Sequence, residues 1–231
     1  MVGAGRRAVM AAAMLGIAGR GAIAFADTLS KGGPQGGPPG GPPGGRMTFR
    51  MVRHGDEIGR HNLVFERQGD AMAVHTSIDA VVTLLSVPIY RYRHRASETW
   101  SRGALNGLVS ETDKNDEKQW AKASRGVDGL AVTGSQTRPY LAPSGAMPAS
   151  YWNRQMLDGP MISLEDGVLL RPKIEPLGAE AVKLASGARV PGEHFRLSGA
   201  FAADVFYERN GDWAGLVLSV PDGSEIRYER L

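Results

Sequence analysis

The chain has 231 residues, with 31 Gly, 14 Pro, no Cys and 7% aromatic residues. This length allows a sizeable core, and the composition favours one β-rich domain with some unstructured sequence. Without cysteine the chain can form no disulfide bond and carry no lipid on a cysteine, so burial alone must stabilise it. The formal net charge of +3 comes from the three arginines of residues 1–26, and equal numbers of basic and acidic side chains follow. A general nucleic-acid binder is therefore not predicted.

Residues 1–26 have the three parts of an export signal peptide: a basic start at residues 5–7, an apolar stretch at residues 8–18 and a small-x-small cleavage site at residues 24–26. The paired arginines resemble a twin-arginine signal, and the general secretion route stays open beside it. Arg20 argues against an uncleaved anchor, and no later run approaches the roughly 20 apolar residues that a membrane span requires. We expect a mature protein in the periplasm or secreted, with no transmembrane span.

Residues 27–45 contain the tract GGPQGGPPGGPPGG, which repeats every four residues rather than every three as a collagen helix requires. Such a tract cannot bury apolar surface, and we expect a solvated linker of mixed polyproline and flexible character. A single β-rich domain is then predicted over residues 46–231.

Within that domain, short runs of alternating apolar and polar residues are separated by turn residues, which is typical of antiparallel strands. The runs of the first half are Met47–Arg53, Leu63–Gln68, Ala71–Leu84, Leu85–Trp100, Ala104–Thr112, Lys118–Arg125 and Gly129–Ser135. Three prolines make Arg138–Ser150 an irregular segment. The runs of the second half are Gly167–Lys173, Ala179–Leu184, His194–Ser198, Ala203–Glu208, Ala214–Val220 and Glu225–Arg230. About ten strands would leave costly open edges unless the sheet curls. We predict an all-β fold, an antiparallel meander curled into a barrel or half-barrel.

The run Leu85–Trp100 has the clearest two-sided pattern, and Pro88 indicates an edge or a bulge within it. Counting in twos separates its side chains into a set of rings, Tyr90, Tyr92 and His94, and a set of guanidinium groups, Arg91, Arg93 and Arg95. We expect the rings to face an interior and the guanidinium groups to face solvent or an anion.

Two interpretations of the rings stay open. With Trp100, and with Tyr151 and Trp152 of a second aromatic segment, they are candidate contacts for a lipid or glycan ligand. The alternatives are a packed sheet face for the strand and a hydrophobic plug for the second segment.

The guanidinium groups also have two interpretations. Arg91, Arg93 and Arg95 would follow one another at about 7 Å, close enough to hold a phosphate, uronate or other carboxylate-bearing ligand. Alternatively they pair across the sheet with acids, for which the candidates are Asp79, Glu98 and Glu111.

No recognised motif fixes a reaction, a cofactor or a metal. His54, Asp56, Glu57 and His61 are metal ligands by type, but they lack a known ligand spacing, and two glycines explain the same segment as a tight hairpin. Without a nucleophile elbow or P-loop, catalysis would depend on His94 as a general base.

Several segments together resemble one family. These are HGDEIG, YRYRHR with ETW, SETDKND, PASYWN, and the closing Tyr-x-x-Asn-Gly-Asp with Asp-Gly-Ser-x-x-x-Tyr. The chain is similar to an uncharacterised family of exported bacterial β-meander domains. The resemblance implies a curled sheet distantly similar to periplasmic lipid carriers or lipocalin-like barrels, and it implies no activity.

The leading hypothesis is a non-catalytic periplasmic domain that binds or carries an apolar or glycan-like envelope molecule. The alternatives are an envelope-acting enzyme with His94 as general base, and a structural or scaffold protein of the cell envelope.

Overall fold

The computed structural model describes residue 42 and residues 44–231, so the predicted export signal and most of the predicted linker lie outside the described residues. Thirteen strands form one large antiparallel sheet. The first eight are β1 (Arg46–Arg53), β2 (Asp56–Gln68), β3 (Ala71–Leu84), β4 (Val87–Ser101), β5 (Ala104–Lys114), β6 (Glu117–Gly126), β7 (Gly129–Gly134) and β8 (Thr137–Leu141). The last five are β12 (Lys173–Lys183), β13 (Arg189–Ser198), β14 (Ala203–Glu208), β15 (Trp213–Ser219) and β16 (Glu225–Arg230).

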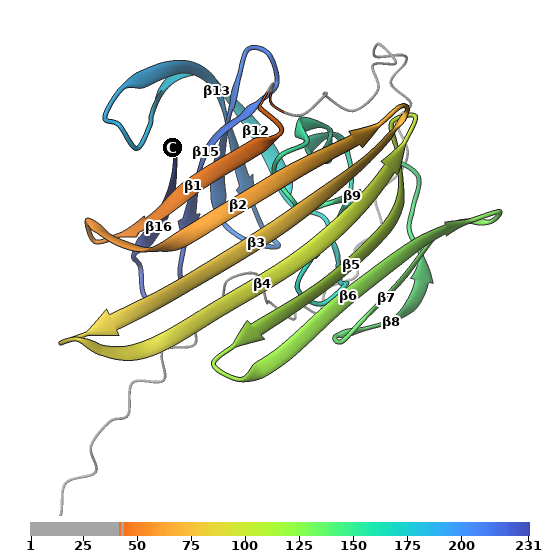
Figure 1. The fold of residues 1–231 in the computed structure, drawn as a ribbon, viewed down its shortest axis with the longest axis horizontal. Coiled ribbons are helices and arrows are strands. Elements are labelled where there is room, and N and C mark those ends of the chain that lie inside the picture. Colours follow the sequence, from red (N-terminus) through yellow and green to blue (C-terminus); the bar gives the residue numbers. More distant parts are fainter. Residues whose placement is uncertain (1–41, 43) are drawn as a thin grey trace, which may run out of the picture.

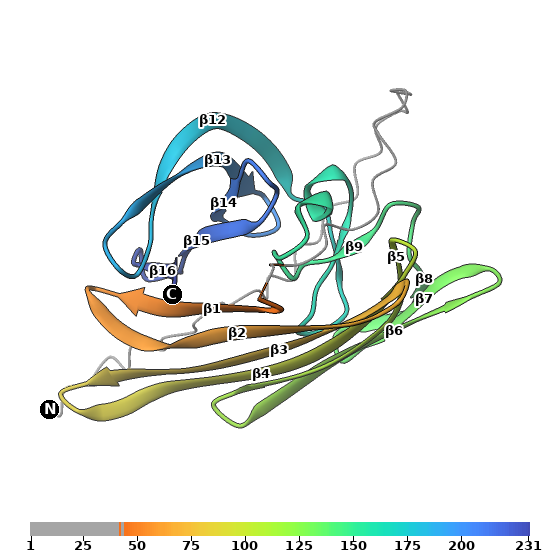
Figure 2. The ribbon, with the colours of Figure 1, turned by 45° about the horizontal axis from the view of Figure 1, so that its top comes forward.

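The strand order is β12-β13-β14-β15-β16-β1-β2-β3-β4-β5-β6-β7-β8, so the sheet is a meander whose two halves meet where β16 pairs with β1. Strands β1 to β8 make a long curved surface, and β12 to β16 turn over its concave side (Figures 1 and 2). The two outer strands, β8 and β12, do not pair with each other, so the sheet stays open. The predicted all-β fold, an antiparallel meander curled into a barrel or half-barrel, is therefore confirmed, and the open sheet corresponds to the half-barrel.

The pairing of β1 with β16 joins residues that are far apart in the chain. Arg50 lies opposite Glu229, and its Nε donates to the Glu229 carboxylate at 2.8 Å across a separation of 179 residues. Lys183 lies 3.5 Å from the same carboxylate. This pairing of β1 with β16, here called the joint, lies in the middle of the sheet rather than at an edge.

Residues 142–172, here called the inner segment, lie against the concave side of the sheet (Figure 2). They include the 3-10 helix η1 (Arg154–Asp158) and a small second sheet of three short strands, β9 (Met147–Pro148), β10 (Met161–Ile162) and β11 (Leu169–Leu170). Trp152 packs edge-on against Phe65 and Trp100, each with ring centroids 5.4 Å apart. The Ser110 hydroxyl donates to the Leu164 carbonyl at 2.5 Å. The inner segment thus supplies much of the core that a curled sheet alone would leave empty.

Several predicted boundaries are wrong: β2 begins at Asp56 rather than Leu63, β12 at Lys173 rather than Ala179, and β13 at Arg189 rather than His194. Residues 138–141, placed by sequence in an irregular segment, belong to β8. Pro139 is tolerated there because β8 is an outer strand, where one missing N–H donor does not interrupt a ladder on both sides. Pro88, by contrast, lies at the irregularity predicted for it, since the β3–β4 register shifts between Val82 and Thr83.

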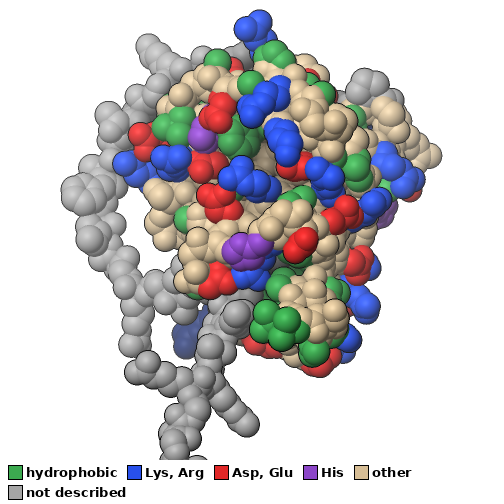
Figure 3. All heavy atoms as spheres, turned by 90° about the vertical axis from the view of Figure 1, so that its left-hand side faces the viewer, with side chains coloured by type: hydrophobic (Ala, Val, Ile, Leu, Met, Phe, Trp, Pro, Cys, Tyr) green, Lys and Arg blue, Asp and Glu red, His purple; other side chains and the backbone are tan. Residues whose placement is uncertain are grey.

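The β3–β4 hairpin ends in a group of exposed hydrophobic side chains: Val81, Leu84, Leu85, Val87 and Ile89. Figure 3 shows one face of the molecule, and hydrophobic side chains, in green, gather at its lower end. Both turn residues, Leu85 and Ser86, have positive φ angles, 50° and 66°. Residues other than Gly and Asn adopt this backbone conformation at a cost in free energy.

Among the described residues, the structure has no helix of the length and apolar character needed to cross a bilayer.

Candidate functional site

Strand β4 has the predicted alternation. Tyr90, Tyr92, His94 and Trp100 are buried on the concave side of the sheet, whereas Arg91, Arg93 and Arg95 are exposed on the convex side. Alternation of this kind follows from the pleat of a strand, which sends successive side chains to opposite faces. The concave side of β4 therefore faces the inner segment.

A narrow crevice lies between this face and the inner segment. Its volume is about 40 Å³, and it is lined by His61, Thr76, Ile78, Tyr92, His94, Ala149, Ser150, Tyr151, Leu164, Glu165, Leu218 and Tyr228. We call it the interior crevice. Of the six predicted ligand contacts, the structure brings Tyr92, His94 and Tyr151 to its wall, whereas Tyr90, Trp100 and Trp152 are buried outside it. Ligand contact by these six residues stays a prediction.

Besides the hydroxyl of Ser150, which lies against Glu98, four buried polar atoms of the crevice wall have no hydrogen-bond partner in the described part of the chain. They are Nδ1 and Nε2 of His61, Oγ1 of Thr76 and the hydroxyl oxygen of Tyr151. Burial lowers the pKa of His61 to about 3, and the nearby His94 contributes to the shift. His61 is therefore a neutral imidazole at pH 7, with one donor and one acceptor unused. Unused polar atoms are costly inside a protein, and they indicate water or a ligand.

Tyr151 also has an unusual backbone, with φ at 64°. A bulky residue adopts this conformation only when its surroundings hold it there, and such strain often accompanies functional sites. Here Tyr207 donates its hydroxyl to the Tyr151 carbonyl at 2.8 Å, and the Tyr151 ring stacks on Trp213 with centroids 5.6 Å apart. The strained residue is thus held from two sides, with its hydroxyl at the crevice.

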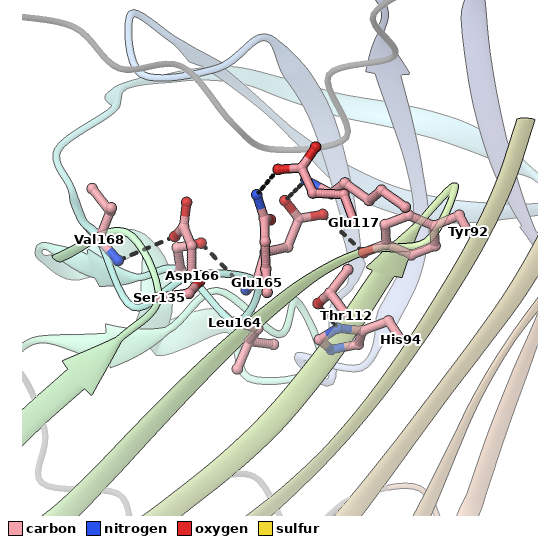
Figure 4. Close-up of polar contacts among 12 residues, drawn as sticks. Tyr92, His94, Thr112, Glu117, Ser135, Leu164, Glu165, Asp166 and Val168 are labelled. Carbon is pink, nitrogen blue, oxygen red and sulfur yellow. Dashed lines mark hydrogen bonds and ion pairs between the residues drawn. The ribbon is translucent and has the colours of Figure 1, made fainter.

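Glu165 of the inner segment also lines the crevice, and its carboxyl group faces the Tyr92 hydroxyl of β4 (Figure 4). It accepts hydrogen bonds from the Tyr92 hydroxyl at 2.8 Å and from Lys114 Nζ at 2.5 Å. Burial raises the pKa of Glu165 to about 7, although the Lys114 charge opposes the shift. Beside it, His94 Nδ1 lies 2.8 Å from the Thr112 hydroxyl, and burial lowers the pKa of His94 to about 4.

The expected pairing of Glu98 with the arginines is wrong. Glu98 lies on the concave side of β4 and is fully buried. Its Oε2 accepts hydrogen bonds from the indole N–H groups of Trp100 at 2.9 Å and Trp152 at 3.1 Å. Burial raises the pKa of Glu98 to about 7, and the Ser150 hydroxyl and both indoles oppose the shift. Glu98 therefore fastens the inner segment to the sheet.

On the convex side, two of the three arginines bind one acid. Arg95 donates two hydrogen bonds of 2.8 Å to the carboxylate of Asp79, and Arg93 Nε lies 3.4 Å from Asp79. Glu111 stands opposite Arg95 in the register of β4 and β5. Anion binding by Arg91, Arg93 and Arg95 stays a prediction.

The acidic and histidine residues of the first hairpin do not converge. His61 lies inside the sheet, whereas Asp56 and Glu57 are exposed near the turn. Across residue 42 and residues 44–231, no group of three or more histidine or acidic side chains is arranged to hold a metal ion.

An open, curled antiparallel sheet whose concave side is filled by its own inner segment defines a β-barrel-like domain. The chain belongs to the family described as domain of unknown function DUF6134, which it matches over residues 49–231. The predicted resemblance to an uncharacterised β-domain family is thereby confirmed.

A solved structure shares this fold. It is the crystal structure of a beta-barrel-like protein of domain of unknown function DUF1849 from Brucella abortus, with a TM-score of 0.57 and 10% sequence identity over 80% of this chain and 94% of that chain. At this identity the likeness shows the fold alone. No curated protein matches the chain.

Proposed function

We propose that this domain is a non-catalytic binding protein of the cell envelope, and that the interior crevice takes the polar end of a glycan-like molecule. The observation that carries the proposal is the set of four unpartnered polar atoms on His61, Thr76 and Tyr151 around one crevice. The envelope location rests on the export signal predicted from residues 1–26.

The chemistry of the wall favours a polar ligand over an apolar one. An acyl chain in the crevice would leave the four atoms unpaired, at about 1–3 kcal/mol for each group. Each hydroxyl of a ligand would pair with up to three of them, since a hydroxyl donates one hydrogen bond and accepts two.

The size of the crevice limits what enters it. Its volume of about 40 Å³ has room for roughly one or two water-sized groups. Only a terminal group, such as a hydroxymethyl, therefore fits between the sheet and the inner segment, and the rest of the ligand lies outside.

The state of His94 favours binding over catalysis. The hydroxyl partner that a catalytic role requires is present, because Thr112 lies 2.8 Å from its Nδ1. The lowered pKa of about 4, however, makes the imidazole a weak base at neutral pH. The enzyme hypothesis is accordingly the second candidate.

Native mass spectrometry of the exported protein, purified without detergent, tests the proposal. We expect a co-purifying hydroxyl-rich molecule, lost in the variants Thr76→Val and His61→Leu. Ser77→Ala, on the other face of β3, serves as the matched control and should keep the ligand. Recovery of an acyl lipid, or of the same ligand from Thr76→Val, would contradict the proposal.

A further inference from the structure

The convex side of the sheet has a hollow that the interior crevice does not touch. It lies over β4, β5 and β6 and has a volume of about 540 Å³. The register places Arg93, Asp113 and Lys118 in one row across these strands, and Arg95, Glu111 and Trp120 in the next. We call this surface the Trp120 platform.

Trp120 is the exposed one of the four tryptophans. This residue is 39% exposed, whereas Trp100, Trp152 and Trp213 are exposed by 2% or less. An indole on an open sheet face presents a broad apolar surface that binds the C–H groups of a sugar ring or another flat partner. Lys122 Nζ lies 5.7 Å from the centre of the ring, so a cation stands beside that surface.

The cations of the platform are not all satisfied within the protein. Arg95 is held by Asp79, but Arg93 makes only the 3.4 Å contact with Asp79 and its side chain is 72% exposed. Lys118 and Lys122 form no ion pair within 4.0 Å with any described residue. The wall of the hollow has four basic and two acidic side chains, and Asp79 beside it pairs with two of the basic ones, so basic side chains still exceed acidic ones by one. An anionic ligand is therefore favoured there.

The two acids decide which anion fits. Asp113 stands between Arg93 and Lys118 in one row, and Glu111 stands beside Arg95 in the next. Both acids would repel a closely spaced row of phosphates. A sugar chain places a hydroxyl beside each carboxylate that it carries. The acids would accept hydrogen bonds from those hydroxyls while the cations bind the carboxylates.

We propose that the Trp120 platform binds an acidic polysaccharide of uronate-type sugars, with one sugar ring on Trp120 and carboxylates at Arg93, Lys118 and Lys122. Arg93 and Lys118 are two strands apart, or roughly 10 Å at the usual strand spacing. They therefore bind different sugar units of one chain. This site is independent of the interior crevice.

Tryptophan fluorescence provides the experiment, because Trp120 is the tryptophan accessible to iodide. Oligogalacturonate should shield Trp120 from iodide quenching and bind measurably by calorimetry, whereas its fully methyl-esterified, neutral form should do neither. Added salt should weaken the binding, since the charges are exposed.

Variants localise the site. Trp120→Ala should weaken binding of oligogalacturonate by about tenfold, with Trp120→Tyr restoring most of it, and Arg93→Gln or Lys118→Gln should each weaken it by about two- to fivefold. Arg67→Gln, an exposed cation on β2, is the matched control and should bind as the wild type does. Unchanged melting temperatures show that the variants fold.

Three results would overturn the proposal: equal binding of the neutral ester, unchanged binding by Trp120→Ala, or tighter binding of single-stranded DNA than of oligogalacturonate. Thr76→Val in the interior crevice should bind oligogalacturonate normally, so failure of one site is distinguishable from failure of the other.

Discussion

The substitution Glu98→Gln tests whether the buried carboxyl that fastens the inner segment controls stability through its ionisation. Burial raises the pKa of Glu98 from its ordinary value of 4.5 to about 7. In the unfolded chain the same group loses its proton near pH 4.5. As pH rises from 4.5 to 7, the unfolded state releases this proton before the folded state does. Glu98 therefore lowers the free energy of unfolding progressively over that window, and by a constant amount above it.

The size of the effect follows from the shift. A displacement from 4.5 to about 7 corresponds to about 3 kcal/mol at 1.36 kcal/mol per pH unit. Glutamine has nearly the same shape and does not titrate, so Glu98→Gln does not incur this loss. We expect the variant to gain about 2–3 kcal/mol relative to wild type between pH 5 and pH 8.

Urea unfolding of both proteins at pH 5 and pH 8 measures this difference. The other buried titratable groups are common to wild type and variant, so their contributions cancel. Glu66→Gln, at an exposed position on β2, is the control and should show no such change. Parallel pH profiles for wild type and Glu98→Gln would refute the reasoning.

Three further predictions concern the turn, a close approach and a buried histidine. Replacing Leu85 by Asn and Ser86 by Gly relieves two positive φ angles and should raise the free energy of unfolding by about 1 kcal/mol; a loss of stability in chemical unfolding would contradict this. Gly134→Ala should destabilise by about 3 kcal/mol or more, because its Cβ would overlap backbone of the inner segment, whereas Gly126→Ala meets nothing within 4 Å. Equal melting temperatures for these two variants would show that the contact is absent. His61 has its pKa lowered to about 3, so it stabilises the fold above pH 6.5, and this contribution is lost as pH falls toward 3. His61→Leu should accordingly flatten the fall of melting temperature between pH 6 and pH 4, and an unchanged slope would exclude the burial of a neutral ring.

Local pattern was sufficient for most of the sheet. The bounds predicted for Ala71–Leu84, Ala203–Glu208 and Glu225–Arg230 are those of β3, β14 and β16. Each run alternates in twos and is flanked by turn residues, so its ends are marked by residues close in sequence. The same alternation separated the rings of β4 from its arginines.

The burial of Glu98 could have been predicted from the same alternation. The count in twos that places Tyr92 and His94 inside also places Glu98 inside. Because its side chain is acidic, Glu98 was expected in an exposed ion pair, although the alternation indicates a buried position. An acid in phase with buried rings is therefore a signal of a functional or fastening group, since such residues are seldom fully buried without partners.

The interior crevice could not be predicted in the same way. His61 and Thr76 come from neighbouring strands, but Tyr151 and Glu165 come from the inner segment, whose residues 142–172 have little periodicity. Their meeting depends on how the sheet curls, and no local pattern encodes that. The sequence identified Tyr151 and Trp152 as a ligand contact or a plug, and only the structure shows that they pack inside the curl.

The joint between β1 and β16 has a consequence for how the chain folds. The central pairing closes across 179 residues, so β1 stays without one of its two neighbours until nearly all of the domain has been synthesised. Closing so long a loop costs chain entropy before any contact compensates for it, and such topologies fold slowly. During that interval the unpaired edge of β1 is open to wrong partners. Refolding of this domain should therefore be limited by the arrival of its last strand, whichever hairpins form first.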